Sequence, residues 1–242
     1  MIKEDFIPEN FKATLVAINY NFSSTSAFDE ELENKGIIKK YNLLRIPSDI
    51  QINGPLPNDP MIMQQLTSIA PCEYVTDKTK IKLQYRGVET KLIIDKDNFN
   101  KEQDAEEFKS LSEDVLDLKI SDIRAIGINY SADFNLGSAR LKLLNTEVED
   151  IEDFKNNITF EFVLPIEYID RDEIATYRVK KVSGGDNTGN DRIYNVSVNF
   201  HYKFESYNTS TKVKKIEDIL RLDNYNDYIK KANGFLNIND KQ

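Results

Sequence analysis

A short strand-like stretch occurs twice in this chain, and the recurrence constrains its fold more than any other feature. Leu15–Tyr20 reads Leu-Val-Ala-Ile-Asn-Tyr, and Ala125–Tyr130 reads Ala-Ile-Gly-Ile-Asn-Tyr, about 110 residues later. A second similarity, between Glu113–Leu118 and Glu217–Leu222, is spaced by about 104 residues, and each copy lies in a segment with helical periodicity. The two spacings nearly agree, which favours an internal duplication.

The expected elements follow one order in both halves: a strand, a helical segment, several antiparallel strands and a long closing helix. Alternation of apolar and polar residues predicts strands, and a 3.6-residue spacing predicts helices. In the first half we expect strands near 11–22, 43–46, 79–86 and 88–94, and helices near 27–35 and 101–118. In the second half we expect strands near 123–134, 158–166, 175–180 and 194–204, and helices near 138–144, 147–155 and 211–232.

These patterns predict an α+β fold made of two similar halves, residues 1–119 and 120–242. Each half would curl an antiparallel sheet around its closing helix, because a sheet and a helix each have one apolar face to bury. The strands that begin the halves are apolar on both faces, which suits the centre of a sheet. We expect them to pair edge to edge, which would remove two exposed edges and pack the halves as one globular pseudo-dimer.

Composition narrows the classes of function. The 242 residues carry a formal net charge of −9, which makes DNA or RNA an unlikely general partner because affinity for nucleic acids comes mainly from Lys and Arg. The chain has no apolar run long enough to span a bilayer, and Met1–Asp5 does not resemble a secretory signal. Cys72 is the single cysteine, so no disulfide framework exists. We expect a cytoplasmic protein of bacterial or phage origin.

Residues with catalytic chemistry are few, and each has a simpler interpretation. His201, the only histidine, falls on the polar side of the last strand, and Cys72 has no other histidine available as a base. The loop Ser183–Asp191 has the glycine content of a phosphate-binding loop but lacks its Gly-Lys-Ser/Thr signature. Two acidic clusters lack the spacing of a calcium loop: Glu149, Asp150, Glu152 and Asp153, and Asp170, Asp172 and Glu173. We therefore expect no metal site, no cofactor and, on balance, no enzymatic activity.

A row of basic residues is the polar surface that we select as the candidate binding site. These residues alternate with apolar ones on predicted strands of both halves, so they would lie on similar sheet faces. They are Lys80, Lys82, Arg86, Lys91, Arg178 and Lys180.

Three functions are consistent with this sequence. The first is a non-enzymatic protein that binds another macromolecule, most simply another protein or a second copy of itself, through its sheet faces or loops. The second is a small-ligand module with a pocket between a curved sheet and its closing helix, lined by Tyr20, Tyr130, Tyr177 and Phe200. The third is a metal-dependent hydrolase that uses the acidic clusters. We favour the first function.

Overall fold

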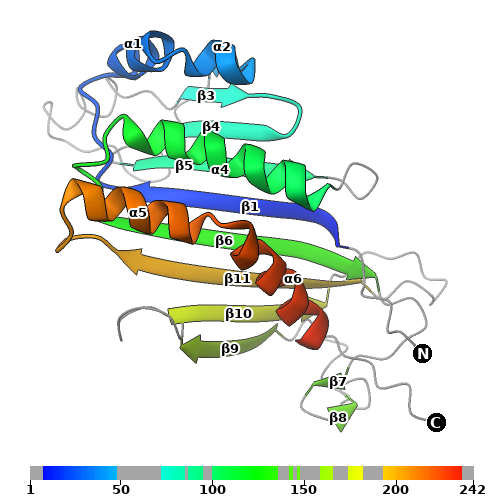
Figure 1. Ribbon diagram of the computed structural model, residues 1–242. Coiled ribbons are helices and arrows are strands. Elements are labelled where there is room, and N and C mark those ends of the chain that lie inside the picture. The colour runs from blue at the N-terminus through cyan, green and yellow to red at the C-terminus, as the bar shows by residue number, and fades with distance from the viewer. Residues whose placement is uncertain are drawn as a thin grey trace, which may run out of the picture.

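A computed structural model describes residues 8–47, 72–84, 87–94, 100–135, 142–143, 146–147, 159–165, 174–181 and 193–235. Nine antiparallel strands form one sheet, and the helices of the described residues lie against one of its faces (Figure 1). The strands of this sheet are β1 (Glu9–Ile18), β2 (Leu44–Pro47), β3 (Cys72–Val75), β4 (Thr79–Gln84), β5 (Gly87–Ile94), β6 (Ala125–Asn135), β9 (Thr159–Pro165), β10 (Ile174–Lys181) and β11 (Ile193–Lys203). The helices are α1 (Thr25–Asn34), α2 (Ile37–Tyr41), α4 (Lys101–Asp117), α5 (Thr209–Ile219) and α6 (Leu222–Phe235).

The first strands of the two halves pair at the centre of the sheet. The order is β2-β3-β4-β5-β1-β6-β11-β10-β9, and β1 runs antiparallel to β6 with Ala13 opposite Tyr130. This order confirms the α+β class, the antiparallel sheet and the predicted edge-to-edge contact. It also buries both edges of each first strand, so the open edges of the sheet fall on β2 and β9.

The two Ile-Asn-Tyr tripeptides do not occupy equivalent positions. In β1 the odd-numbered residues are buried under the helices, whereas in β6 the even-numbered residues are buried. The spacing of about 110 residues between the tripeptides is an even number. Matching residues of β1 and β6 therefore lie on opposite faces of the sheet. Ile18 is 45% exposed, but Ile128 is 1% exposed. Asn19 has a left-handed backbone, with φ of 63°, which ends β1 and turns the next residue, Tyr20, back into the core.

Consequently, the two tyrosines of the tripeptides have different surroundings. Tyr20 packs against Phe22 and Phe28, near α1, whereas Tyr130 stacks with Tyr228 of α6, at a ring-centroid distance of 5.4 Å. The expectation that Tyr20 and Tyr130 correspond is therefore wrong. The prediction treated Asn19 as an ordinary strand residue and so continued β1 past the point where its side-chain alternation changes phase.

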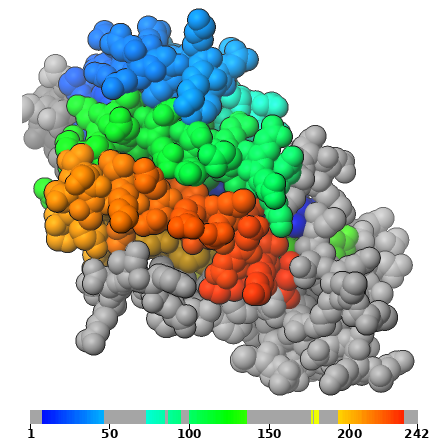
Figure 2. Space-filling view, in the orientation of Figure 1, coloured from blue at the N-terminus to red at the C-terminus, as the bar shows by residue number. Residues whose placement is uncertain are grey.

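One apolar core lies between the sheet and the helices. On the first half it contains aromatic rings from the end of β1, from α1 and from β3, including Tyr74. On the second half, Phe11 of β1 lies 4.7 Å from Tyr225 of α6, measured between ring centroids. Helix α6 therefore packs over the seam between β1 and β6. Figure 2 shows the helices covering this side of the molecule.

The helix boundaries agree with the sequence in part. Helix α1 begins two residues earlier than the predicted segment near 27–35, because the Ser24 side chain caps it by accepting a hydrogen bond from Ala27 N. Gly36, which follows this helix, has a φ of 69°, which glycine adopts without strain. The short helix α2 follows Gly36 and was not predicted. The stripe Phe108, Leu111 and Val115 of α4 is buried, as its spacing predicts.

Two helical predictions in the second half are wrong. The expected helix 211–232 is two helices, and the side-chain amide of Asn224 donates to the carbonyls of Asp218 and Ile219 where α5 ends. This cap satisfies carbonyls that a continuous helix would have bonded internally. The segment expected to be a helix near 138–144 contains the strand β7 (Lys142–Leu143), which pairs with β8 (Thr146–Glu147). The helix expected near 147–155 lies outside the described residues apart from Glu147.

Several expectations fall outside the described residues. They concern the proline-rich loop 54–60, the segment 61–69, the glycine-rich loop 183–191 and both acidic clusters. Among the helices that the structure describes, none is long and apolar enough to cross a bilayer.

Candidate functional site

The side of the nine-stranded sheet opposite the helices, here called the helix-free face, carries the predicted basic residues. Side chains alternate between the two faces of a strand, and residues opposite each other on neighbouring strands share a face. The registers are consistent throughout: Lys80 lies opposite Lys91, Thr14 opposite Lys91, and Thr14 opposite Asn129. No described helix covers this face (Figure 1).

Five of the six predicted site residues lie on this face in two groups. Lys80, Lys82 and Lys91 belong to β4 and β5, and Arg178 and Lys180 belong to β10. Four inter-strand spacings of about 4.8 Å separate β5 from β10 and five separate β4 from β10, which places the two groups roughly 19–24 Å apart. The sixth residue, Arg86, lies outside the described residues.

The first basic group is partly neutralised by Glu73. Its carboxylate lies 2.6 Å from Lys80 Nζ and 3.5 Å from Lys82 Nζ. The hydrogen bond from Lys80 holds the pKa of the Glu73 carboxyl below its usual value, so Glu73 is ionised and pairs with both lysines at neutral pH. The side chains of these ion pairs are half-buried, so the pairs hold the lysines in place on this face.

Counting every described side chain on the helix-free face, basic residues outnumber acidic ones. The basic residues are Lys12, Lys80, Lys82, Lys91, Arg178, Lys180 and Lys203. The acidic residues are Glu9, Glu73, Glu89 and Asp133. The helix layer shows the opposite balance, because the helices contain 15 acidic and nine basic residues. The chain therefore separates its charges across the two sides of the sheet, although its net charge is −9.

Neutral polar side chains fill the centre of the helix-free face, between the two basic groups. The amide of Asn199 donates to the side chain of Asn129 on the neighbouring strand. Asn195 donates to Ser131 Oγ at 3.0 Å and to Asp133 Oδ1 at 2.7 Å. These cross-strand bonds order a surface of amides and hydroxyls that can still form hydrogen bonds with a partner.

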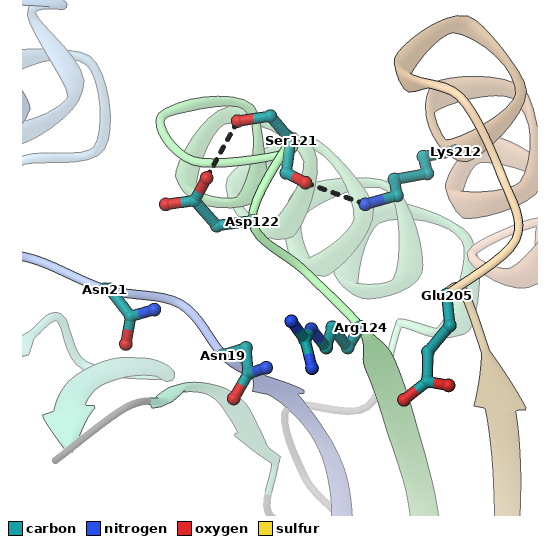
Figure 3. A pocket seen from close by; sticks show the side chains of 7 residues that line it. All are labelled: Asn19, Asn21, Ser121, Asp122, Arg124, Glu205 and Lys212. Carbon is teal, nitrogen blue, oxygen red and sulfur yellow. Dashed lines mark hydrogen bonds between the residues drawn. The ribbon is translucent and has the colours of Figure 1, made fainter.

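A polar cavity lies at the end of the central strands, away from the predicted basic groups (Figure 3). Its volume is about 490 Å³. It is lined by Asn19, Asn21, Ser121, Asp122, Arg124, Glu205 and Lys212. These residues come from the segments that leave β1, enter β6 and leave β11, and from the first turn of α5. The three strands end together here, so their connections form the walls.

Sequence patterns explain how this cavity is assembled. Asn19 and Asn21 alternate with Tyr20 and Phe22, whose rings are buried, so anchoring the rings leaves the two amides at the cavity. On the opposite wall, Lys212 is only 6% exposed, and its ammonium donates to the carbonyls of Ser121 at 2.8 Å and Ile123 at 2.6 Å. Burial lowers the pKa of Lys212, and repulsion from the positive charge of Arg124 lowers it further.

Sequence reasoning missed this cavity, although one signal was present. The run Asn-Tyr-Asn-Phe after β1 alternates polar and aromatic residues, and we interpreted it as a continuation of the strand. That run lies near residues 121–124 and 205–212 only because β1, β6 and β11 are neighbours in the sheet. No local pattern could have brought these segments together.

The other candidates do not assemble into a reactive site. Cys72 on β3 and His201 on β11 are separated by five inter-strand spacings, roughly 24 Å, which excludes a thiol–imidazole pair. Tyr20 and Tyr130, predicted to line a ligand pocket, are core residues, and the side chain of Tyr177 lies outside the described part of the chain. Within the residues that the structure describes, no three His, Cys, Asp or Glu side chains converge as metal ligands would.

Comparison with known proteins supplies no relative from which a function could be transferred. No protein-family model matches the chain, and no curated protein is significantly similar to it.

Proposed function

We propose that this protein is a non-enzymatic binding protein whose helix-free face docks on an acidic surface or segment of another protein. The observation that carries the proposal is the excess of basic side chains on this face in a chain whose net charge is −9. Complementary charge accelerates association and suppresses wrong partners. An acidic partner would be attracted to this face and repelled by the acidic helix layer, which would orient it before contact.

The shape and chemistry of the face suit a protein surface better than a small molecule. Its centre consists of amides and hydroxyls, bounded by the two basic groups on β4–β5 and on β10. Four large apolar side chains also emerge on this side of the sheet: Ile18, Leu44, Ile46 and Ile93. Apolar contacts within a polar surface are typical of non-obligate protein interfaces.

The same charges argue against a nucleic acid. Phosphate backbones need a continuous basic track, because each neutralised phosphate contributes to affinity. Here the basic groups stand roughly 19–24 Å apart, by the spacing of the strands between them, and Glu73 already pairs with two of the lysines. Lys12 lies between the groups with neutral Ser131 as its cross-strand neighbour.

A matched pair of variants tests the proposal. The first variant combines Lys12→Glu, Lys180→Glu and Lys203→Glu, three exposed positions on β1, β10 and β11. The second combines Lys39→Glu, Lys214→Glu and Lys230→Glu, three exposed positions on the helix layer. The two variants have the same net charge, so a difference between them reports the location of the charge and not its total.

The probes are a short fluorescent peptide rich in Asp and Glu, its Asn/Gln counterpart, and a single-stranded oligonucleotide of equal charge. We expect the acidic peptide to bind with an affinity that falls as salt rises. Affinity should drop at least tenfold in the sheet-face variant and stay near that of the unmodified protein in the helix-layer variant. Equal losses in both variants, or tighter binding of the oligonucleotide, would show that the proposal is wrong.

A second copy of the chain is one partner of this chemistry, because its own helix layer is acidic. Light scattering at low and high salt distinguishes this case from an unrelated partner. Self-association through these surfaces should weaken with salt, disappear in the sheet-face variant, and persist or strengthen in the helix-layer variant, whose helix layer is more acidic. If the molar mass is the same at low and high salt, the partner of the helix-free face is not a second copy of the chain.

We also infer that the two halves arose by duplication of a unit with one strand order. Outward from the centre, β1 is followed by β5, β4 and β3, and β6 is followed by β11, β10 and β9. In each half, therefore, the first strand pairs with the last, and an asparagine, Asn100 or Asn208, caps the helix that follows. Superposition of the two halves tests this inference: β1-β5-β4-β3 should overlay β6-β11-β10-β9 with an odd offset from β1 to β6 and even offsets from β5 to β11 and from β4 to β10, because these offsets keep buried positions aligned.

A further inference from the structure

We propose that the polar cavity at the end of β1, β6 and β11 binds a small monocarboxylate, whose carboxylate group is held by the guanidinium of Arg124 and the amides of Asn19 and Asn21. This site is separate from the helix-free face and does not depend on the function proposed above. Its volume of about 490 Å³ is within the range of pockets that enclose small ligands.

The backbone of Arg124 is fixed while its side chain is available. Arg124 N donates to the carbonyl of Ile18 at 3.1 Å, and its own carbonyl accepts from Phe204 N at 2.8 Å. Residue 124 thus links the ends of all three central strands. Its side chain is exposed and makes no ion pair with the described residues. Arginine presents a planar fork that matches a carboxylate, so a rigidly mounted, exposed guanidinium facing a cavity is suited to that ligand.

The asparagine side chains complete the recognition surface. The amides of Asn19 and Asn21 form no hydrogen bonds with the described part of the protein, so their donors can be directed to a ligand. The left-handed backbone of Asn19 and the buried rings of Tyr20 and Phe22 fix the position of this segment. Figure 3 shows the Arg124 guanidinium directed toward Asn19, with Asn21 and Asp122 bordering the same space.

The opposite wall is braced independently. Lys212 ties the connection before β6 to α5 through the carbonyls of Ser121 and Ile123, and an ammonium has three donors, so one remains. Ser121 Oγ in turn donates to Asp122 Oδ1 at 3.0 Å. These hydrogen bonds hold the walls in place without a ligand. Binding would therefore cost little entropy for ordering the wall residues.

The charges around the cavity favour a single negative charge on the ligand. Two cations, Arg124 and Lys212, face two carboxylates, Asp122 and Glu205. A phosphate dianion would meet repulsion from both carboxylates, whereas a carboxylate could contact Arg124, and its polar or cationic remainder could lie near the acids. The polar lining also disfavours a largely apolar ligand.

Nuclear magnetic resonance titration of the full chain tests the site with acetate, serine and inorganic phosphate as probes. We expect acetate and serine to shift the amide resonances of Asn19, Asn21 and Arg124, with serine binding more tightly because its ammonium and hydroxyl can meet the carboxylates. Arg124→Gln should weaken binding about tenfold, because it removes a charge-assisted pair. Lys214→Gln removes an exposed charge two residues from Lys212 on α5. This control variant should bind the ligands like the unmodified protein.

Three results would overturn the assignment: no shift with either carboxylate, stronger binding of phosphate at these resonances, or equal affinity in the Arg124→Gln variant. Thermal unfolding is the second measurement. The side chain of Arg124 is exposed, so its replacement should leave the unfolding temperature nearly unchanged. The loss of binding would then reflect recognition and not unfolding.

Discussion

The hydroxyl of Tyr20 donates a hydrogen bond to the main-chain carbonyl of Val115. Tyr20 follows the end of β1, and Val115 lies in the last turn of α4, where helix carbonyls lack intrahelical donors. Both residues are fully buried. This bond connects the central strand to the helix above it, and it requires the left-handed turn at Asn19 that directs the ring inward.

Removal of this bond should destabilise the protein measurably. Tyr20→Phe keeps the ring but leaves the Val115 carbonyl buried without its donor, so we expect the free energy of unfolding to fall by about 1–2 kcal/mol. Urea denaturation followed by circular dichroism measures the change. Tyr130→Phe is the matched control, because the hydroxyl of Tyr130 makes no hydrogen bond with the described residues, and it should cost under about 0.5 kcal/mol. Equal losses would contradict the assigned bond.

The buried tyrosines should also make the fold sensitive to alkali. Burial raises the pKa of Tyr20 well above its usual 10.0, and it raises the pKa values of Tyr130 and Tyr225 as well. Below about pH 10 these hydroxyls are neutral in both states, so their effect on stability is constant. Above it the unfolded chain loses protons that the folded chain keeps, and the free energy of unfolding should fall as pH rises. Urea midpoints at pH 9, 10 and 11 measure this trend. Tyr20→Phe should reduce the decline in the free energy of unfolding with pH. The same decline in both proteins would be inconsistent with a buried Tyr20 hydroxyl.

A close contact between β5 and β1 explains the glycine at position 87. A Cβ atom added there would lie 3.0 Å from the carbonyl oxygen of Ala17, a tight contact with backbone that the pairing of β1 with β5 holds in place. We expect Gly87→Ala to lower the free energy of unfolding by about 1–3 kcal/mol, the usual cost of overpacking. Gly127→Ala is the control, because its nearest neighbour, the carbonyl oxygen of Phe200, would lie 4.0 Å away. Thermal melts should show a loss for the first variant and little change for the second; the reverse order would refute the contact.

The bridge made by Lys212 should contribute to stability as well as to the cavity wall. Lys212→Met keeps the buried stem but removes the donors to the carbonyls of Ser121 and Ile123. Hydrogen bonds to a charged group typically contribute more than neutral ones, so we expect a loss of about 2–3 kcal/mol in chemical denaturation. Lys214→Met, an exposed neighbour on α5, should be nearly neutral. If both variants unfold at the same urea concentration, the bridge is not structural.

The sequence predicted most strands of the sheet because their signal is local. Lys80 and Lys82 alternate with Ile81 and Leu83, and this alternation alone places the lysines opposite the core. The same reasoning placed His201 on the polar side of β11, where the structure has it. The long final helix was predicted wrongly at one point, because its division depends on how Asn224 caps the carbonyls of Asp218 and Ile219.

The amino-acid sequence by itself determined which side chains share a face, since the two-residue period of a strand is a property of consecutive residues. It also indicated that β1 is central, because Leu15 and Ala17 on one face and Val16 and Ile18 on the other are apolar. Only the tertiary structure decided that Ile18 and Ile128 face opposite sides, since a single left-handed residue, Asn19, reverses the phase. It alone brought Asn19, Arg124 and Lys212 around one cavity, because that meeting requires strand pairings between residues more than a hundred positions apart.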